Sequence, residues 1–313
     1  EALPRALVRV APQLARTRTP LIVPLGTALA VAGLVPAASF PEALAQSKGT
    51  SARACGEAVT LKTHDGTTTR YALAGPREAP AGDRIALVLL VGGGGDLDLD
   101  DQGCPRALKG NFLVRSLPHF HSEGFFTALV DAPSDHQGGD GLGGFRTSAD
   151  HAADLGLVVT DVRRRTSASV WVVGTSRGTI SAANVASRFT SLATPDGLVL
   201  TSSVTSGSRS ARSKPWVSQT VFDLKLDAIR SPVLVVGHAA DQCARTPPDL
   251  MRDIAAKTRG SRQQVVLVKG GPGLPAGAQA GLDVCEGRTP HGFVEQEAEV
   301  VAGIARFLRG GSY

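Results

Sequence analysis

Six short, mostly apolar runs recur along the chain from about residue 84 to its end. They lack the regular alternation of polar and apolar residues that marks a half-exposed strand. Each run therefore fits a strand covered on both faces, as in a parallel sheet. The runs span residues 85–91, 125–130, 170–173, 198–200, 233–236 and 265–268.

Stretches with helical spacing of apolar residues lie between these runs and after the last one. This spacing predicts a helix over residues 149–162, with Thr147 and Asp150 as its start signal. It predicts another helix over 247–258, which Thr246 would cap. The apolar stripe of a C-terminal helix would comprise Val294, Ala298, Val301, Ile304 and Leu308.

The first two strands are predicted to differ from the rest. Residues 59–62 and 68–73 flank a His-Asp-Gly turn at 64–66, which is typical of a β-hairpin. The whole pattern predicts an α/β fold: a mainly parallel sheet, helices on both of its faces and an N-terminal antiparallel hairpin. The long, Ser-rich connection over residues 202–231 is expected to form a rim or a short cap.

The N-terminus has the layout of a signal peptide over residues 1–45. Several arginines precede a long apolar run, and Ala43-Leu44-Ala45 would supply a small-x-small cleavage site. The alternative is a membrane anchor, but Pro24 and Pro36 break the run. Cleavage would leave residues 46–313 as one catalytic domain, in the periplasm or outside the cell, without stable membrane association.

Composition and charge exclude several classes of protein. The chain has 313 residues, of which 42% are hydrophobic and 19% charged, as in an ordinary globular protein. Its net charge of +5 is scattered, and no cluster of Lys and Arg is interleaved with aromatic residues, so we expect no nucleic-acid partner. The four cysteines, none with C-x-x-C spacing, argue against a zinc site and allow disulfides after export. The oligomeric state stays open.

Residues 174–178 carry the strongest chemical signal. Their sequence is Gly-Thr-Ser-Arg-Gly, and it lies between an apolar run and a helix-like segment. In that setting Gly-x-Ser-x-Gly is typical of the nucleophile elbow, a strained turn that exposes a serine at the start of a helix. We therefore expect Ser176 to be a nucleophile, with an ordinary strand-to-helix turn as the alternative.

A serine nucleophile needs a base, and the base needs an acid that orients it. In a parallel sheet both come from loops that follow later strands. His291 follows the last predicted strand and Asp241 the strand before it, so we assign them as base and acid. Asp196 precedes a strand and so lies at the wrong end of the sheet. The competing histidines are His64, His119, His121, His136, His151 and His238.

The order Ser176, Asp241, His291 is the order of the α/β-hydrolases. On these residues and on the elbow, the chain from about residue 58 to 310 resembles the α/β-hydrolase superfamily. It looks closest to the compact esterases and dienelactone-hydrolase-like members. The resemblance implies that the three residues form a catalytic triad that acts on an ester bond.

The oxyanion that forms during such a reaction needs two backbone N–H donors. One is expected at Arg177, directly after the nucleophile, and the other in the glycine run 92–95 that follows an apolar strand. The family's H-G-G-G loop is matched only in part, because Val91 replaces its histidine. Gly93 and Gly94 therefore both stay open as the second donor.

Two further patterns point only weakly to ligands. Residues 139–144 contain G-x-G-x-x-G, but they lie well beyond their strand, so a flexible active-site loop is favoured over a nucleotide site. Asp96, Asp98 and Asp100 alternate as in a calcium loop, but its Gly and Glu are missing. We expect neither a cofactor nor a metal.

Loop location also suggests how the cysteines pair. A Cys243–Cys285 bond would tie the loop of the acid to the loop of the base, and Cys55 would then join Cys104. The sequence alone leaves the other pairings open.

These features together predict a secreted serine hydrolase. It would cleave carboxylic esters, either small molecules or accessible polymers, through an acyl-enzyme. The main alternative is a non-catalytic binding protein with the same fold. A nucleotide-dependent oxidoreductase is a third reading, which the misplaced glycine motif disfavours.

Overall fold

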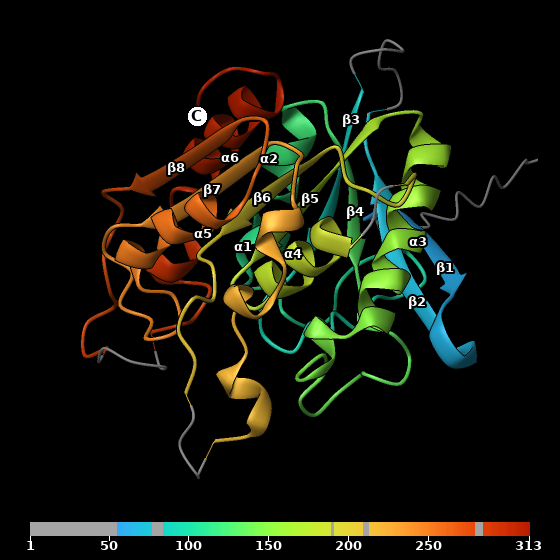
Figure 1. Cartoon of the computed structure of the whole chain (residues 1–313), viewed down its shortest axis with the longest axis horizontal. Coiled ribbons are helices and arrows are strands. Elements are labelled where there is room, and N and C mark those ends of the chain that lie inside the picture. Colours follow the sequence, from blue (N-terminus) through green and yellow to red (C-terminus); the bar gives the residue numbers. More distant parts are fainter. Residues whose placement is uncertain (1–54, 77–83, 189–190, 209–212, 279–283) are drawn as a thin grey trace, which may run out of the picture. The chain divides into compact units, whose positions relative to one another are not determined.

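Within the described residues, eight strands form one sheet. In order across it they are β1 (Glu57–Lys62), β2 (Thr68–Ala74), β4 (Phe126–Val130), β3 (Ile85–Leu90), β5 (Ser169–Thr175), β6 (Gly197–Thr201), β7 (Val233–His238) and β8 (Gln263–Val268) (Figure 1). β2 pairs antiparallel with both β1 and β4, and all other neighbours are parallel. The predicted mainly parallel sheet and its N-terminal hairpin are confirmed.

The structure is a computed structural model. It describes residues 55–76, 84–188, 191–208, 213–278 and 284–313. The signal peptide expected over residues 1–45 lies outside these stretches. Among the described residues, no helix has both the length and the apolar character needed to cross a membrane.

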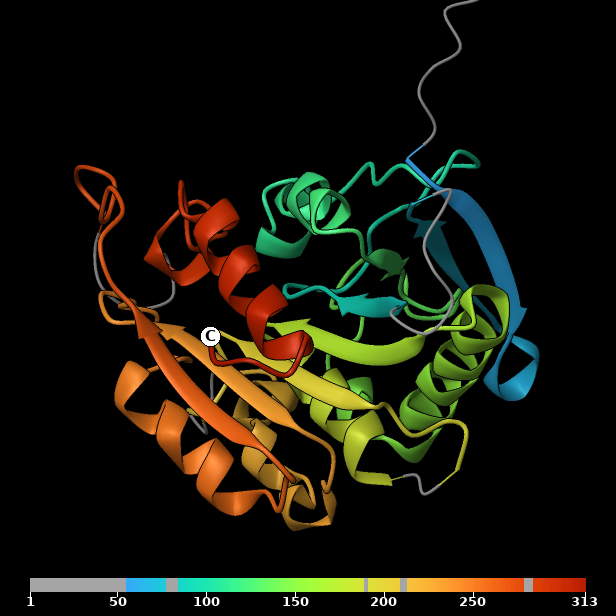
Figure 2. The same cartoon turned by 90° about the horizontal axis from the view of Figure 1, so that it is seen from above.

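Helices cover both faces of the sheet (Figure 2). One face carries α3 (Ala149–Thr166), α4 (Gly178–Arg188) and α5 (Met251–Lys257), and the other carries α1 (Phe112–Arg115), α2 (Leu117–Ser122) and α6 (Glu297–Leu308). In β3, Val88 packs on the α3 side and Leu89 on the α6 side, and both are fully buried. Each such side chain stabilises the fold by about 1.5–3 kcal/mol. This burial on both faces explains why the strands are apolar throughout.

The start of α3 differs slightly from the prediction. Its first turn follows Ser148, whose side chain accepts a hydrogen bond from the His151 N–H at 3.0 Å. The start signal predicted at Thr147 and Asp150 is therefore misplaced by one residue. The physical reason is that a serine hydroxyl satisfies one of the unpaired N–H groups of the first turn as well as a threonine does.

The last two helices also differ in part from the prediction, although Val301, Ile304 and Leu308 of the predicted C-terminal stripe are buried. α5 begins at Met251, after a short 3-10 turn, η6 (Pro248–Leu250). Thr246 does not cap it, because its hydroxyl donates to Asp241. In α6, Ala298 of the predicted stripe is exposed. The large apolar residues that α6 buries are Val300, Val301, Ile304, Phe307 and Leu308.

The loops that follow parallel strands gather at one edge of the sheet, where the carboxyl ends of the strands lie. The long connection after β6 contains three short 3-10 turns, η3 (Pro215–Ser218), η4 (Val221–Asp223) and η5 (Leu226–Ala228). Its described residues thus form the short rim that was predicted, and this rim adjoins the candidate site.

Candidate active site

Ser176 lies on a tight turn between β5 and α4. Its φ of +51° is in the left-handed region, which is strained for a residue with a side chain. The neighbouring glycines make the turn feasible: a Cβ on Gly174 would lie 2.6 Å from the Gly178 carbonyl oxygen, and a Cβ on Gly178 only 2.0 Å from the Leu90 carbonyl oxygen. Backbone packing therefore requires the Gly-x-Ser-x-Gly spacing.

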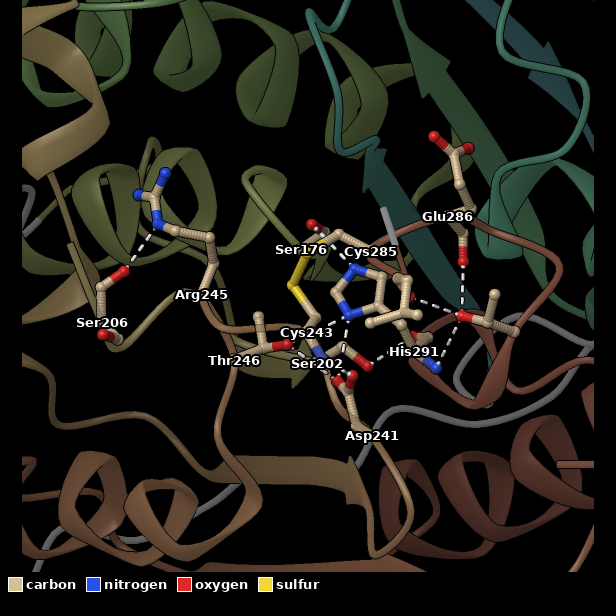
Figure 3. Close-up of a disulfide and its surroundings, with 12 residues drawn as sticks. Ser176, Ser202, Ser206, Asp241, Cys243, Arg245, Thr246, Cys285, Glu286 and His291 are labelled. Atoms are coloured by element: carbon tan, nitrogen blue, oxygen red, sulfur yellow. Dashed lines mark hydrogen bonds and ion pairs between the residues drawn. A yellow bond between two sulfur atoms is a disulfide. The ribbon is translucent and has the colours of Figure 1, made fainter. Parts of the chain in front are cut away.

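The three side chains predicted to react together do meet (Figure 3). Ser176 Oγ lies 3.0 Å from His291 Nε2, and His291 Nδ1 lies 3.0 Å from Asp241 Oδ2. Asp241 comes from the loop after β7, and His291 from a 3-10 turn, η7 (Pro290–Gly292), that precedes α6. Only 1% of the Asp241 side chain and 4% of the His291 side chain are exposed. His291 is thus placed to take a proton from Ser176 while Asp241 holds its other nitrogen.

A fourth side chain, Thr246, completes this arrangement. Its hydroxyl donates to Asp241 Oδ2 at 2.8 Å and lies 3.1 Å from His291 Nδ1. The Cys243 N–H donates to the other Asp241 oxygen at 2.9 Å. With the carboxylate oriented in this way, the proton of the neutral imidazole belongs on Nδ1, and Nε2 faces Ser176 as an acceptor. Sequence reasoning missed Thr246, although it lies in the same loop as Asp241.

The main chain at His291 is fixed as well. Ser202 Oγ donates to the His291 carbonyl oxygen at 2.6 Å, and Thr289 Oγ1 accepts from the His291 N–H at 3.2 Å. Ser202 directly follows β6, so the connection from that strand helps to position the base. Neither residue was identified from the sequence.

Comparison with solved structures identifies the fold that carries these side chains. No family model and no curated protein matches the chain significantly. Esterase 2 of Thermogutta terrifontis has a TM-score of 0.54 at 16% identity, covering 82% of this chain and 96% of that one. Est1E of Butyrivibrio proteoclasticus has a TM-score of 0.52 at 12% identity, covering 81% of this chain and 98% of that one. Dienelactone hydrolase of Anabaena variabilis has a TM-score of 0.52 at 12% identity, covering 82% of this chain and 97% of that one. This chain has the α/β-hydrolase fold.

In this α/β-hydrolase fold, the glycine loop after β3 faces the nucleophile. A Cβ on Gly92 would lie 2.8 Å from Ser176 Cβ. Gly93 has a φ of +59° and lines both pockets beside Ser176. Gly94 is not among the described residues that line either pocket, and its carbonyl accepts from the Leu142 N–H at 2.8 Å. Of the two glycines left open by the sequence, Gly93 is therefore the one that lies in the described lining of the pockets.

A buried arginine holds the same loop. Arg146 donates through Nη2 to the carbonyls of Val91 at 3.2 Å and Gly93 at 3.3 Å, and through Nη1 to Ser181 Oγ at 2.7 Å. Burial, followed by repulsion from Arg177, lowers the pKa of Arg146 to about 9. Its guanidinium has no carboxylate partner among the described residues. Carbonyl and hydroxyl dipoles therefore balance its charge.

Two disulfides occur among the described residues, and both have the predicted pairing. Cys243–Cys285 joins the loop of Asp241 to the segment that precedes η7, with Cα atoms 4.7 Å apart (Figure 3). Cys55–Cys104 joins the start of β1 to the loop after β3, with Cα atoms 4.9 Å apart. Only the first of them adjoins the triad.

Two competing residues have structural roles instead. His238 Nε2 lies 3.0 Å from Gln296 Oε1, and His238 Nδ1 accepts from the Ala240 N–H at 3.0 Å, so both ring nitrogens are engaged. Asp196 pairs with Arg163 at 2.7 Å and precedes β6, at the amino end of the strand. Neither of them reaches the nucleophile.

The other ligand-like motifs also have structural partners. Asp96 accepts a hydrogen bond from the Gly138 N–H at 2.7 Å, so it joins two loops. A Cβ on Gly141 would lie 2.3 Å from the Gly94 carbonyl oxygen. Residues 139–144 thus pack on the glycine loop after β3, and they are followed by a short 3-10 turn, η2 (Phe145–Thr147), not directly by an α-helix.

Two clusters in the described part of the chain bring three potential metal ligands within 4.8 Å of one another. One belongs to the triad and includes the disulfide sulfur of Cys243. The other comprises His64, Asp135 and His136, and the ring nitrogens of His64 lie 3.1 Å from Asp135 Oδ2 and 2.6 Å from Asp154 Oδ2, which is outside the cluster. In both clusters the ligand atoms already have bonding partners.

Ser176 lines two pockets, so a bound ester can extend in two directions from it. The larger pocket has a volume of about 470 Å³, and its rim carries exposed charges of both signs, Glu286 and Arg288. The smaller pocket has a volume of about 250 Å³. Its described lining comprises Gly93, Ser176, Arg177, Val204, Trp216, Val217, Cys243, Arg245 and Cys285.

Proposed function

We propose that this protein is a secreted serine hydrolase that cleaves carboxylic esters. The observation that carries the proposal is the continuous chain of contacts from Ser176 through His291 to Asp241, with the serine on a strained turn beside two pockets. Proteins with the same fold that are named as an esterase and a dienelactone hydrolase support ester bonds as the target.

In the acylation half of the reaction, Ser176 Oγ attacks the carbonyl carbon of the ester while its proton passes to His291 Nε2. The charge of Asp241 stabilises the imidazolium that forms. The N–H groups of Arg177 and Gly93 receive the oxyanion. When the tetrahedral intermediate collapses, the bond to the alcohol oxygen breaks, and His291 returns the proton to that oxygen.

In the deacylation half, water takes the place of the alcohol. His291 accepts a proton from the water, whose oxygen attacks the acyl carbon bound to Ser176. The second tetrahedral intermediate uses the same two N–H donors. Its collapse breaks the bond to Ser176 Oγ, which regains the proton from His291 as the carboxylic acid leaves.

The proposed substrates are small or accessible polymeric esters. Short turns make up the described part of the connection after β6, and they leave room for esters presented at a surface. We place the mature protein in the periplasm or outside the cell. The two disulfides support this location, since such bonds persist in oxidising compartments.

Labelling with a fluorophosphonate probe tests the proposal. The wild-type protein should be labelled at Ser176 and should hydrolyse p-nitrophenyl acetate. Ser176→Ala should fold but do neither, because loss of the nucleophile costs several orders of magnitude in rate. The control Ser218→Ala should keep both properties. A protein that binds esters but is neither labelled nor active would instead be a binding protein with this fold.

A further inference from the structure

The smaller pocket beside Ser176 carries positive charge and has no carboxylate in its described lining. Its charged side chains are Arg177 and Arg245, and no aspartate or glutamate is among the described residues that line it. Two like charges in a confined, partly desolvated space repel each other. Burial first, and then the charge of Arg245, lower the pKa of Arg177 to about 10, although the nearby Asp140 carboxylate acts in the opposite direction. An anion in this pocket would offset both the repulsion between the two arginines and the cost of burying Arg177.

Among the described residues, Arg177 is held by an aromatic ring and not by an ion pair. Its Cζ lies 4.0 Å from the centre of the Trp216 ring, and its Nη2 is buried without a hydrogen-bond partner in the described part of the chain. Trp216 is itself fixed, because its Nε1–H donates to Asp140 Oδ2 at 3.1 Å. The other oxygen of Asp140 accepts from Lys214. This neighbouring carboxylate is thus engaged by two other donors.

Arg245 is oriented by neutral groups. Its Nε donates to the Ser206 carbonyl at 2.6 Å (Figure 3), and its Nη2 donates to the Gln219 carbonyl at 2.9 Å. These carbonyls fix the guanidinium without neutralising it. A guanidinium fixed in this way keeps further N–H groups in a planar fork, which matches the two oxygens of a carboxylate.

We propose that the smaller pocket binds a carboxylate of the substrate, so that the esters cleaved at Ser176 carry a negative charge a few bonds from the reacting carbonyl. This inference rests on the proposed function and adds a substrate class to it. The volume of about 250 Å³ is enough for roughly eight groups of the size of water, at about 30 Å³ each. A carboxylate on a short chain fits within that space.

Matched pairs of esters test this assignment. p-Nitrophenyl hydrogen glutarate carries the carboxylate on the acyl side, and 4-carboxyphenyl acetate carries it on the alcohol side; the methyl ester of each carboxylate is the neutral partner. We expect kcat/KM for the charged member of at least one pair to exceed that of its partner by about 10- to 100-fold, the effect of a charge-assisted hydrogen bond. Equal values within both pairs would overturn the proposal.

Two substitutions assign the preference to this pocket. Arg245→Met should remove most of the preference, whereas the control Arg252→Met, on the exposed side of α5, should keep it. Val217→Glu adds a carboxylate to the same lining at a partly exposed position, so it should fold even if Arg245→Met does not. It should abolish or reverse the preference. A preference that survives Val217→Glu would place the carboxylate elsewhere.

Binding measured without turnover separates this inference from the proposed function. Glutarate should bind to Ser176→Ala in calorimetry, and at least about 10-fold more weakly when Arg245→Met is added. If the wild-type protein cleaves esters but Ser176→Ala does not bind glutarate and the ester pairs show no charge preference, the proposed carboxylate subsite is wrong and the proposed hydrolase activity is retained. If no ester is cleaved but glutarate binds through Arg245, the hydrolase is wrong and the carboxylate site stands.

Discussion

The Thr246 hydroxyl donates a hydrogen bond of 2.8 Å to the Asp241 carboxylate. Thr246 is fully buried, so water cannot replace this donor if it is lost. Since the same oxygen of Asp241 faces His291 Nδ1 at 3.0 Å, the bond sets the direction in which the carboxylate meets the base. Thr246 is thus a positioning residue for the acid.

Thr246→Val removes the hydroxyl and keeps the shape of the side chain. We expect kcat to fall by about 10- to 100-fold, which corresponds to one hydrogen bond to a charged group. KM should change little, because the residue is not in the described lining of either pocket. Steady-state kinetics with p-nitrophenyl acetate measure both constants. Thr246→Ser should recover most of the rate, and an unchanged kcat in Thr246→Val would remove Thr246 from the mechanism.

Arg146 provides the second prediction, because its replacement should lower the reaction rate strongly and the stability much less. Arg146→Met removes the donors to the carbonyls of Val91 and Gly93, so the loop that presents the Gly93 N–H should lose its alignment. A lost oxyanion donor costs about 10²–10³ in kcat, and we expect an effect approaching that range. The Tm should fall only moderately, because the substitution leaves the partners of Arg146 unpaired but also removes the cost of burying its charge. Thermal melting and steady-state kinetics on the same sample measure Tm and kcat. A large fall in both quantities would indicate a purely structural role for Arg146.

The two disulfides provide a matched pair for the third prediction. Cys243–Cys285 and Cys55–Cys104 span 42 and 49 residues, so replacing either pair by serine should lower the unfolding free energy by a similar amount, about 2–4 kcal/mol. Only the loss of Cys243–Cys285 should also lower kcat under native conditions, because it joins the loop of Asp241 to the segment before His291. Denaturant titration and initial rates give the two readouts. Equal rates for both double variants would show that this bond does not position the triad.

The fourth prediction concerns pH and His64, which joins the hairpin turn to α3 through Asp154. Burial opposes the charge of His64, but hydrogen bonds to Asp154 and Asp135 outweigh it and raise the pKa of His64. The folded state therefore binds this proton more tightly than the unfolded state does. The resulting stability is complete below a pH of about 6.5 and is lost as the pH rises through the raised pKa.

His64→Gln should therefore destabilise the protein more at about pH 6 than at about pH 9. At the lower pH, the unfolding free energy should fall by about 1.5–3 kcal/mol. Denaturant titrations at the two pH values measure the difference. Burial raises the pKa of Asp154, so the comparison is not extended to more acidic pH, where protonation of this carboxylate would also contribute. A cost of His64→Gln that grows with pH would contradict the charged state of His64.

Much of the fold, and the contact between the three candidate side chains, could be predicted because the relevant constraints act over a few residues. The strands are buried on both faces, so each is apolar along its length and stands out from the loops. Glycine is required at positions 174 and 178 because a Cβ there would make contacts of 2.6 Å and 2.0 Å. The elbow can therefore be recognised from the five-residue motif alone. Once parallel strands are assigned, the loops after them must lie at one edge, which brings Asp241 and His291 toward Ser176.

Tertiary structure alone decided which partners the other polar groups find. Thr246 had the sequence context of a helix cap, but folding turned its hydroxyl to Asp241. Arg146 lies 53 residues from Gly93, and Trp216 lies 39 residues from Arg177, yet each pair is in contact. Such contacts depend on how helices and loops pack around the sheet. For these residues, position in the sequence did not indicate the buried donor or acceptor that packing brought beside them.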